Sequence, residues 1–77
     1  MEGAWVGGRF QVLYQRIVGE RHVKAKLAAA PGMEIGAIAF NQEPIEAQSV
    51  RALYRLEANE FRGYVNAQLV IEEWRAD

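Results

Sequence analysis

The chain has 77 residues, of which 51% are apolar and 25% are charged, with a net charge of −1 and no cysteine. This length holds one domain, here 1–77, and the composition excludes a disordered tail, disulfide bridges and thiolate metal sites. The sequence shows neither a signal peptide nor an apolar run long enough for a membrane span, which predicts a cytoplasmic protein without a membrane partner.

Alternation of apolar and polar residues runs through most of the chain and predicts five strands, because successive side chains of a strand face opposite sides. The strands are expected at Arg9–Val18, His22–Ala28, Ile35–Phe40, Val50–Ala58 and Tyr64–Trp74. Turn residues separate them at about ten-residue intervals. With one helical turn at most, between Pro44 and Ser49, this pattern favours an all-β barrel or sandwich.

The first predicted strand breaks its own alternation. Phe10, Val12 and Tyr14 share one face, whereas Ile17 falls out of phase with them. An extra residue in a strand produces such a phase shift and bends the strand, as closure of a small barrel requires. We therefore predict a bulged, strongly curved first strand with Tyr14 on the inner face.

The second predicted strand has one apolar and one basic face. Alternation places Val23, Ala25 and Leu27 on the inner side, and the basic residues that separate them on the outer side. Five basic residues and one acidic residue lie within 9–26, whereas the rest of the chain carries four basic and nine acidic residues. This asymmetry is compatible with one positive face that attracts polyanions, and equally with ordinary solvated charge.

The inventory of reactive side chains is short. The chain has one histidine, His22, one aspartate, Asp77, one serine, Ser49, and no threonine. Metal centres need several converging ligands, and nucleophilic catalysis needs a nucleophile beside a base. The sequence therefore predicts no catalytic residue, no metal site and no cofactor within this chain.

Four short stretches resemble a known family: Val18–Lys24, Ile38–Asn41, Tyr54–Gly63 and Ala67–Ile71. Their order and spacing, across 8–74, are similar to the C-terminal OB domain of bacterial RecJ. The resemblance implies a five-stranded OB-type barrel with little or no helix, cut from a larger nuclease. It further implies a parent that degrades single-stranded DNA from the 5′ end in DNA repair and recombination, with a divalent metal, Mn or Mg, in separate N-terminal domains.

The resemblance also implies where a single DNA strand is held, since OB folds bind on the face of strands two and three and on the neighbouring loops. Phosphate contacts are then expected from basic residues and base stacking from an aromatic residue of the loop between strands four and five. The expected nucleic-acid-binding residues are Arg21, His22, Lys24, Lys26, Phe61, Arg62 and Tyr64.

Other interpretations of the same residues stay open. Lys24 and Lys26 also suit protection of a strand edge against pairing with another chain, and Phe61 also suits packing in a core or an interface. The alternative function is a barrel that docks the other RecJ domains or single-stranded-DNA-binding protein. The feature that would distinguish this docking function from DNA binding is an exposed apolar patch formed by Trp5, Val70 and Trp74.

Overall fold

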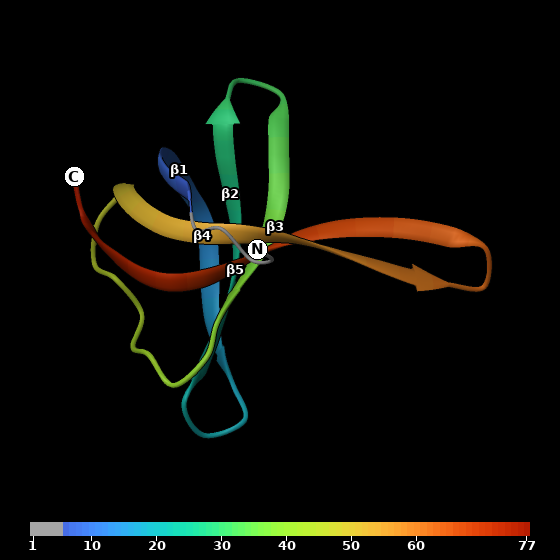
Figure 1. The fold of residues 1–77 in the computed structure, drawn as a ribbon. Coiled ribbons are helices and arrows are strands. Elements are labelled where there is room, and N and C mark those ends of the chain that lie inside the picture. Colours follow the sequence, from blue (N-terminus) through green and yellow to red (C-terminus); the bar gives the residue numbers. More distant parts are fainter. Residues whose placement is uncertain (1–5) are drawn as a thin grey trace.

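Five strands account for most of residues 6–77, the part of the chain that the computed structural model describes, apart from the side chains of Asn59 and Phe61. The strands are β1 (Val6–Val18), β2 (His22–Ala30), β3 (Met33–Ala39), β4 (Ser49–Phe61) and β5 (Tyr64–Ala76). They close into a barrel in the order β1-β2-β3-β5-β4 (Figure 1). The predicted all-β, five-stranded barrel of OB type is confirmed.

Closure of the barrel depends on β1, which pairs with a different neighbour along each half of its length. Its first half, Val6–Gln11, is antiparallel to β4, and its second half, Gln11–Val18, is antiparallel to β2. The ring is completed by the antiparallel pairs β2–β3 and β4–β5 and by a short parallel pairing of β3 with β5. The outer surface of β1 is therefore shared by two faces of the barrel.

A bulge interrupts β1, as the sequence predicts, but it changes the face of Tyr14. Val12 lies opposite Leu27 and Tyr14 lies opposite Lys26, so that Leu13 is the extra residue. Beyond a bulge the inward and outward positions of a strand exchange. Tyr14 consequently faces outward and is 54% exposed, and the prediction of an inward Tyr14 was wrong.

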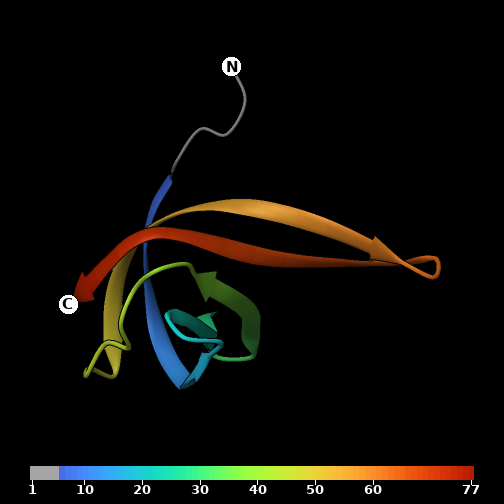
Figure 2. The same ribbon diagram turned by 90° about the horizontal axis from the view of Figure 1, so that it is seen from below.

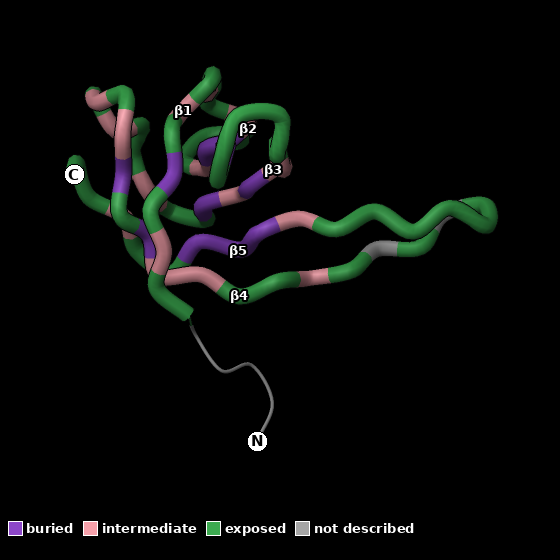
Figure 3. Tube along the Cα trace, turned by 90° about the horizontal axis from the view of Figure 1, so that it is seen from above, coloured by how far each residue is buried: buried purple, intermediate pink, exposed green. Residues whose placement is uncertain are grey.

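The core fills the narrow barrel with side chains from the inward positions of all five strands, as small barrels require. Its larger members are Phe10, Val23, Leu27, Val50, Leu69 and Ile71, and four alanines occupy the remaining inward positions. Figure 3 shows the buried segments gathered where the strands cross and the exposed segments at their ends. The predicted apolar face of β2 is thus part of the core.

The end of the β4–β5 hairpin leaves the barrel as a two-stranded arm, which we define as residues 58–67. These residues pair only with one another, and Figures 1 and 2 show the arm extending away from the other strands. Arg62 and Gly63 form its two-residue turn with φ values of 53° and 84°, as a type I′ hairpin requires. The expected five-residue turn was too long, because β4 continues to Phe61.

On the arm and beside it, the apolar residues that alternation assigns to the inner side of the strands are not covered by a core. Leu56 is 64% exposed and Val65 is 66% exposed, and Ala58 and Ala67 are exposed as well. The alternation of the fourth and fifth predicted strands places these four residues on the core side, and that prediction is wrong. Alternation reports which side of a strand a residue occupies, but it does not report whether another layer covers that side.

The loop between β3 and β4 covers one end of the barrel without forming a helix. The side-chain amide of Gln15 donates to the Ile45 carbonyl at 2.6 Å and accepts from the Ile45 amide at 3.0 Å, which seats Ile45 against the core. The side-chain Nε2 of Gln42 donates to the Ile71 and Glu72 carbonyls at 2.9 and 3.1 Å. Within residues 6–77 no helix is long and apolar enough to cross a membrane.

Two neighbouring glycines of β1 provide a matched test of packing. A Cβ atom on Gly8 would lie 3.1 Å from the Phe10 ring and 3.2 Å from the Tyr54 ring, whereas one on Gly7 would meet nothing within 4 Å. We expect Gly8→Val to destabilise the barrel by about 1–3 kcal/mol through overpacking. Gly7→Val is expected to leave stability equal or slightly higher, and equal urea midpoints for the two variants would contradict this account.

Candidate nucleic-acid interface

The basic residues of β2 lie on the outer face of the barrel. His22, Lys24 and Lys26 alternate with the buried Val23 and Ala25. Lys24 is exposed, and His22 and Lys26 are half-buried. Arg21, in the turn before β2, is exposed as well. The core packing of the inward residues fixes the direction of the outward ones, so the basic stripe is a rigid feature of the barrel.

The pairing of β1 with β2 adds two residues to this stripe. Tyr14 lies opposite Lys26, and Arg16 lies opposite Lys24. Side chains of directly opposite residues emerge on the same face, with Cβ atoms about 4.5–5.5 Å apart. An exposed phenol ring and a third cation therefore stand beside the two lysines. Sequence reasoning missed Tyr14 and Arg16, since their outward direction depends on the position of the bulge.

No ion pair joins these cations to a carboxylate among the described residues. Ion pairs join Arg9 to Asp77 and Arg55 to Glu57, and neither pair includes Arg16, Lys24 or Lys26. The stripe keeps its positive charge exposed to solvent, which is the arrangement that attracts an anionic polymer.

His22 links the stripe to the loop that follows β3. Its Nδ1 atom accepts a hydrogen bond from the Asn41 backbone amide at 3.1 Å, and its ring meets the Phe40 ring edge-on with centroids 5.3 Å apart. Because Nδ1 accepts, the neutral imidazole carries its proton on Nε2. Phe40 is 49% exposed and adds a second aromatic surface that sequence reasoning did not select.

The strand β3 borders β2 on the side away from β1, and next to Lys26 it carries a glycine without a side chain. Gly36 lies opposite Lys26, and Ile38 lies opposite Lys24. A Cβ atom on Gly36 would meet nothing within 4 Å. The backbone of β3 is therefore open to a ligand beside the lysine, a common use of glycine in strands that approach a ligand closely.

The remaining predicted site residues lie elsewhere. Arg62 and Tyr64 are at the tip of the arm, where Tyr64 is 73% exposed, and Figures 1 and 2 place this tip away from β2. The side chain of Phe61 lies outside the described residues. The structure thus brings together the predicted residues of β2 and separates them from those of the hairpin turn.

The predicted apolar patch does not form from the residues expected to build it. Val70 is 6% exposed, and Trp74 is half-buried and packs against the core. Trp5 lies outside the described residues. Val70 is covered although it stands on the outward side of β5, opposite Ile38. The exposed patch that the alternative function called for is therefore not formed by Val70 and Trp74.

Among the described residues there is no group of three or more histidine, aspartate or glutamate side chains placed to hold a metal ion. The face formed by β1, β2 and β3 instead offers three cations, two aromatic rings and an accessible backbone. Such a surface suits the phosphates and bases of a single nucleic-acid strand.

The comparison with known families decides the classification. The family described as the RecJ OB domain matches residues 2–73. The chain belongs to the RecJ OB-domain family. This RecJ OB domain is similar to proteins named single-stranded-DNA-specific exonuclease RecJ, at 41% identity in Dickeya dadantii, 38% in Salmonella typhimurium and 37% in Escherichia coli.

The alignments cover 84%, 86% and 84% of this chain, respectively. The chain spans only 12% of the length of each of these relatives. No solved structure matches significantly. The RecJ OB domain is therefore similar to one part of a much longer protein.

Proposed function

We propose that this domain binds single-stranded DNA for a longer RecJ-like 5′-to-3′ exonuclease that acts in DNA repair and recombination. The observation that carries the proposal is the joint placement of Tyr14, Arg16, Lys24 and Lys26 on one face. OB folds bind single strands by combining a positive groove with aromatic side chains on which bases stack. The names of the relatives support the same substrate.

On this face each residue type has a distinct role. Arg16, Lys24 and Lys26 contact phosphates, with Arg21 and His22 at the edge toward the loop after β3. Tyr14 provides the ring on which a base stacks, and the open backbone at Gly36 lets the strand approach closely. None of these contacts reads a base edge, so the binding is insensitive to sequence.

The arm extends the interface for longer strands. Arg62 and Tyr64, and Phe61 with them, contact nucleotides that continue past the barrel. A short oligonucleotide reaches only the face on β1, β2 and β3. We therefore expect the arm to contribute to the binding of long strands and not of short ones.

Catalysis takes place outside this domain. The longer protein holds the nuclease site and its divalent metal, Mn or Mg, in domains N-terminal to this one, and the domain itself is no enzyme and binds no cofactor. It acts in the cytoplasm, without a membrane partner. The chain covers only 12% of the length of the Dickeya dadantii relative, which leaves room for a separate catalytic part and supports this proposal.

A second candidate function rests on the arm and on Leu56 beside it. Leu56, Tyr64 and Val65 are large apolar residues that are 64%, 73% and 66% exposed. Large apolar side chains that are exposed along one hairpin suit contact with another protein surface. The partner in this case is another domain of the same longer protein or single-stranded-DNA-binding protein. Retention of DNA binding after neutralisation of the β2 lysines would favour this candidate.

The decisive test is a titration of labelled oligo-dT with the 77-residue chain, followed by fluorescence anisotropy at several salt concentrations. We expect a dissociation constant on the order of 10⁻⁴ to 10⁻⁶ M near physiological salt. Each of Lys24→Gln and Lys26→Gln should weaken binding and reduce the slope of log K against log salt by about 0.7, the value for one contact to a single strand.

Arg55→Gln is the matched control for this experiment. It also removes one cation, but Arg55 lies on β4 beside Glu57 with Nη2 and Oε2 4.0 Å apart. We expect its salt slope to equal that of the unmodified chain. Flat anisotropy at low salt for the unmodified chain would overturn the proposed function.

A further inference from the structure

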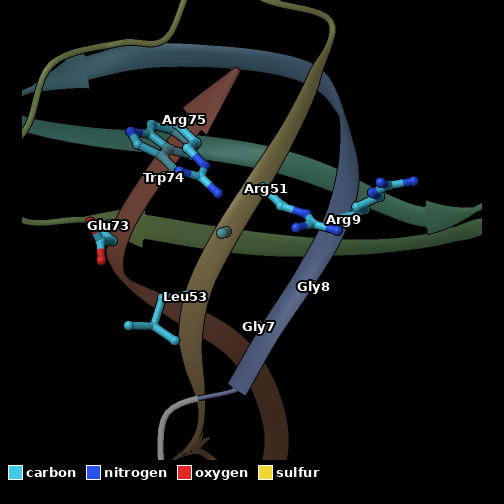
Figure 4. Close-up of a pocket in the computed structure, with 9 residues that line it drawn as sticks. Gly7, Gly8, Arg9, Arg51, Leu53, Glu73, Trp74 and Arg75 are labelled. Carbon is cyan, nitrogen blue, oxygen red and sulfur yellow. The ribbon is translucent and has the colours of Figure 1, made fainter. Parts of the chain in front are cut away.

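Three arginines form a row across β1, β4 and β5. Arg9 lies opposite Arg51, and Arg51 lies opposite Arg75. Directly opposite residues of antiparallel strands emerge on the same face, and all three are exposed. Figure 4 shows these side chains arising from three neighbouring strands. This arginine row stands on a face that does not include β2 or β3.

The row borders a pocket with a volume of about 550 Å³. Two residues along each strand, on the same face, Gly7 lies opposite Leu53, and Leu53 lies opposite Glu73. Gly7 offers no side chain at this position, and a Cβ atom there would meet nothing within 4 Å. The gap at Gly7 opens the surface next to the guanidinium groups, and Leu53 and Trp74 supply apolar lining.

The charges of this row are only partly neutralised within the described residues. Arg9 Nε lies 3.1 Å from Asp77 Oδ2, whereas Arg51 and Arg75 form no ion pair with any described residue. Like charges directly opposite one another in a sheet destabilise it. A bound anion would reduce this repulsion.

The shape of the row indicates the class of anion. A guanidinium group binds a phosphate through two parallel hydrogen bonds. Three adjacent strands place the outer members of the row about 10 Å apart, since neighbouring strands are about 4.8 Å apart. A single phosphate needs only two of these guanidinium groups to satisfy its oxygens. A ligand with repeated anionic groups can contact both ends of the row, and the phosphodiester backbone is one.

The row is connected to the DNA-binding face through β1. Arg9 and Tyr14 both point outward from this strand, on either side of the bulge, and are separated by about 16 Å of extended chain. A single strand that stacks on Tyr14 and follows β1 toward its beginning arrives at the arginine row. No turn of the ligand around the far side of the barrel is needed.

We propose that Arg9, Arg51 and Arg75 form a second phosphate-binding site, which holds the backbone of the single strand after it leaves the β1–β2–β3 face. This inference rests on the proposed function, because it assigns a path to the same ligand. The site determines the length of strand that the domain covers: a strand that engages both faces is longer than one that engages β2 alone.

The test compares Arg51→Gln with Arg55→Gln in the 77-residue chain. Both substitutions remove one outward arginine of β4, but only Arg51 lies in the row. With oligo-dT long enough to reach both faces, Arg51→Gln and Arg75→Gln should each reduce the salt slope by about 0.7, and Arg55→Gln should not. Thermal melting is expected to be unchanged or slightly raised for Arg51→Gln, because a repulsive neighbour is removed.

Nuclear magnetic resonance localises the contact directly. The side-chain Nε–Hε signals of Arg51 and Arg75 should shift on addition of oligo-dT, and those shifts should persist in the Lys24→Gln, Lys26→Gln chain at raised DNA concentration. If unmodified protein binds oligo-dT but these signals stay fixed, the second site is overturned while the proposed function stands. If the unmodified protein binds no oligo-dT at any salt concentration, the proposed function itself fails.

Two other anionic ligands test whether the arginine row prefers a phosphodiester chain. Inorganic phosphate and a hexapeptide of aspartate are titrated under the same conditions. We expect both to shift the arginine signals only at much higher concentration than oligo-dT does, since neither is a phosphodiester chain. Tighter binding of the acidic peptide than of oligo-dT would overturn the assignment to a nucleic-acid strand, and so would saturation by inorganic phosphate alone.

Discussion

Replacing Leu27 with alanine is expected to destabilise the barrel by about 2–5 kcal/mol, the usual cost of removing a buried leucine side chain and leaving a cavity. Leu27 is 0% exposed and belongs to the core cluster. Its neighbours in the narrow interior include small alanines, which cannot extend to fill the space. A single core in a domain of this size rarely supplies more than about 3–5 kcal/mol. The variant is therefore expected to be largely unfolded, with a strongly lowered urea midpoint.

The matched control is Leu56→Ala, the same substitution at a residue that is 64% exposed. Surface substitutions of this kind usually change stability by less than about 0.5 kcal/mol. Circular dichroism at increasing urea concentration measures both variants under identical conditions. Equal midpoints for Leu27→Ala and Leu56→Ala would mean that the interior of the barrel does not hold the fold together.

The part of the site on β2 was predictable from the sequence because its information is local. Val23, Ala25 and Leu27 alternate with His22, Lys24 and Lys26 without interruption, and β2 has partners on both sides over this length. One face of such a strand must enter the core. The outward direction of the basic residues then follows from the apolar ones, with no knowledge of the remaining strands.

The direction of Tyr14 was not predictable in the same way. A bulge somewhere in β1 was inferred from the phase of Ile17, but a phase change does not fix which residue is the extra one. In the structure the extra residue is Leu13, and Ile17 returns to the inward row opposite Val23. Ile17 is nevertheless 59% exposed, at the end of the barrel where the inward side is no longer covered.

The arginine row could not be predicted from the sequence, for a different reason. Arg9, Arg51 and Arg75 come from three distant segments of the chain, and their alignment depends on two strand registers. A shift of one residue in either register would turn one arginine to the other face. Registers of non-local strand pairs are not encoded in the alternation of any single strand, so the row becomes visible only when the barrel is closed.

Replacing Tyr14 with alanine is expected to weaken the binding of oligo-dT by roughly 5- to 150-fold, because loss of one base-stacking contact costs about 1–3 kcal/mol. Tyr14 is 54% exposed and lies opposite Lys26, so a base stacked on its ring would lie beside a cation. Stacking carries little charge, and the salt slope should therefore stay close to that of the unmodified chain. This combination distinguishes Tyr14→Ala from Lys24→Gln, which lowers the slope.

Tyr14→Phe is the control, since it keeps the aromatic surface and removes only the hydroxyl group. It should bind oligo-dT within about twofold of the unmodified chain, because the ring supplies the stacking energy. Urea midpoints close to that of the unmodified chain for both variants would show that the loss arises at the surface. A folded Tyr14→Ala chain with undiminished affinity would remove base stacking from this face and leave a purely electrostatic interface, in which the lysines and Arg16 hold the strand by its phosphates alone.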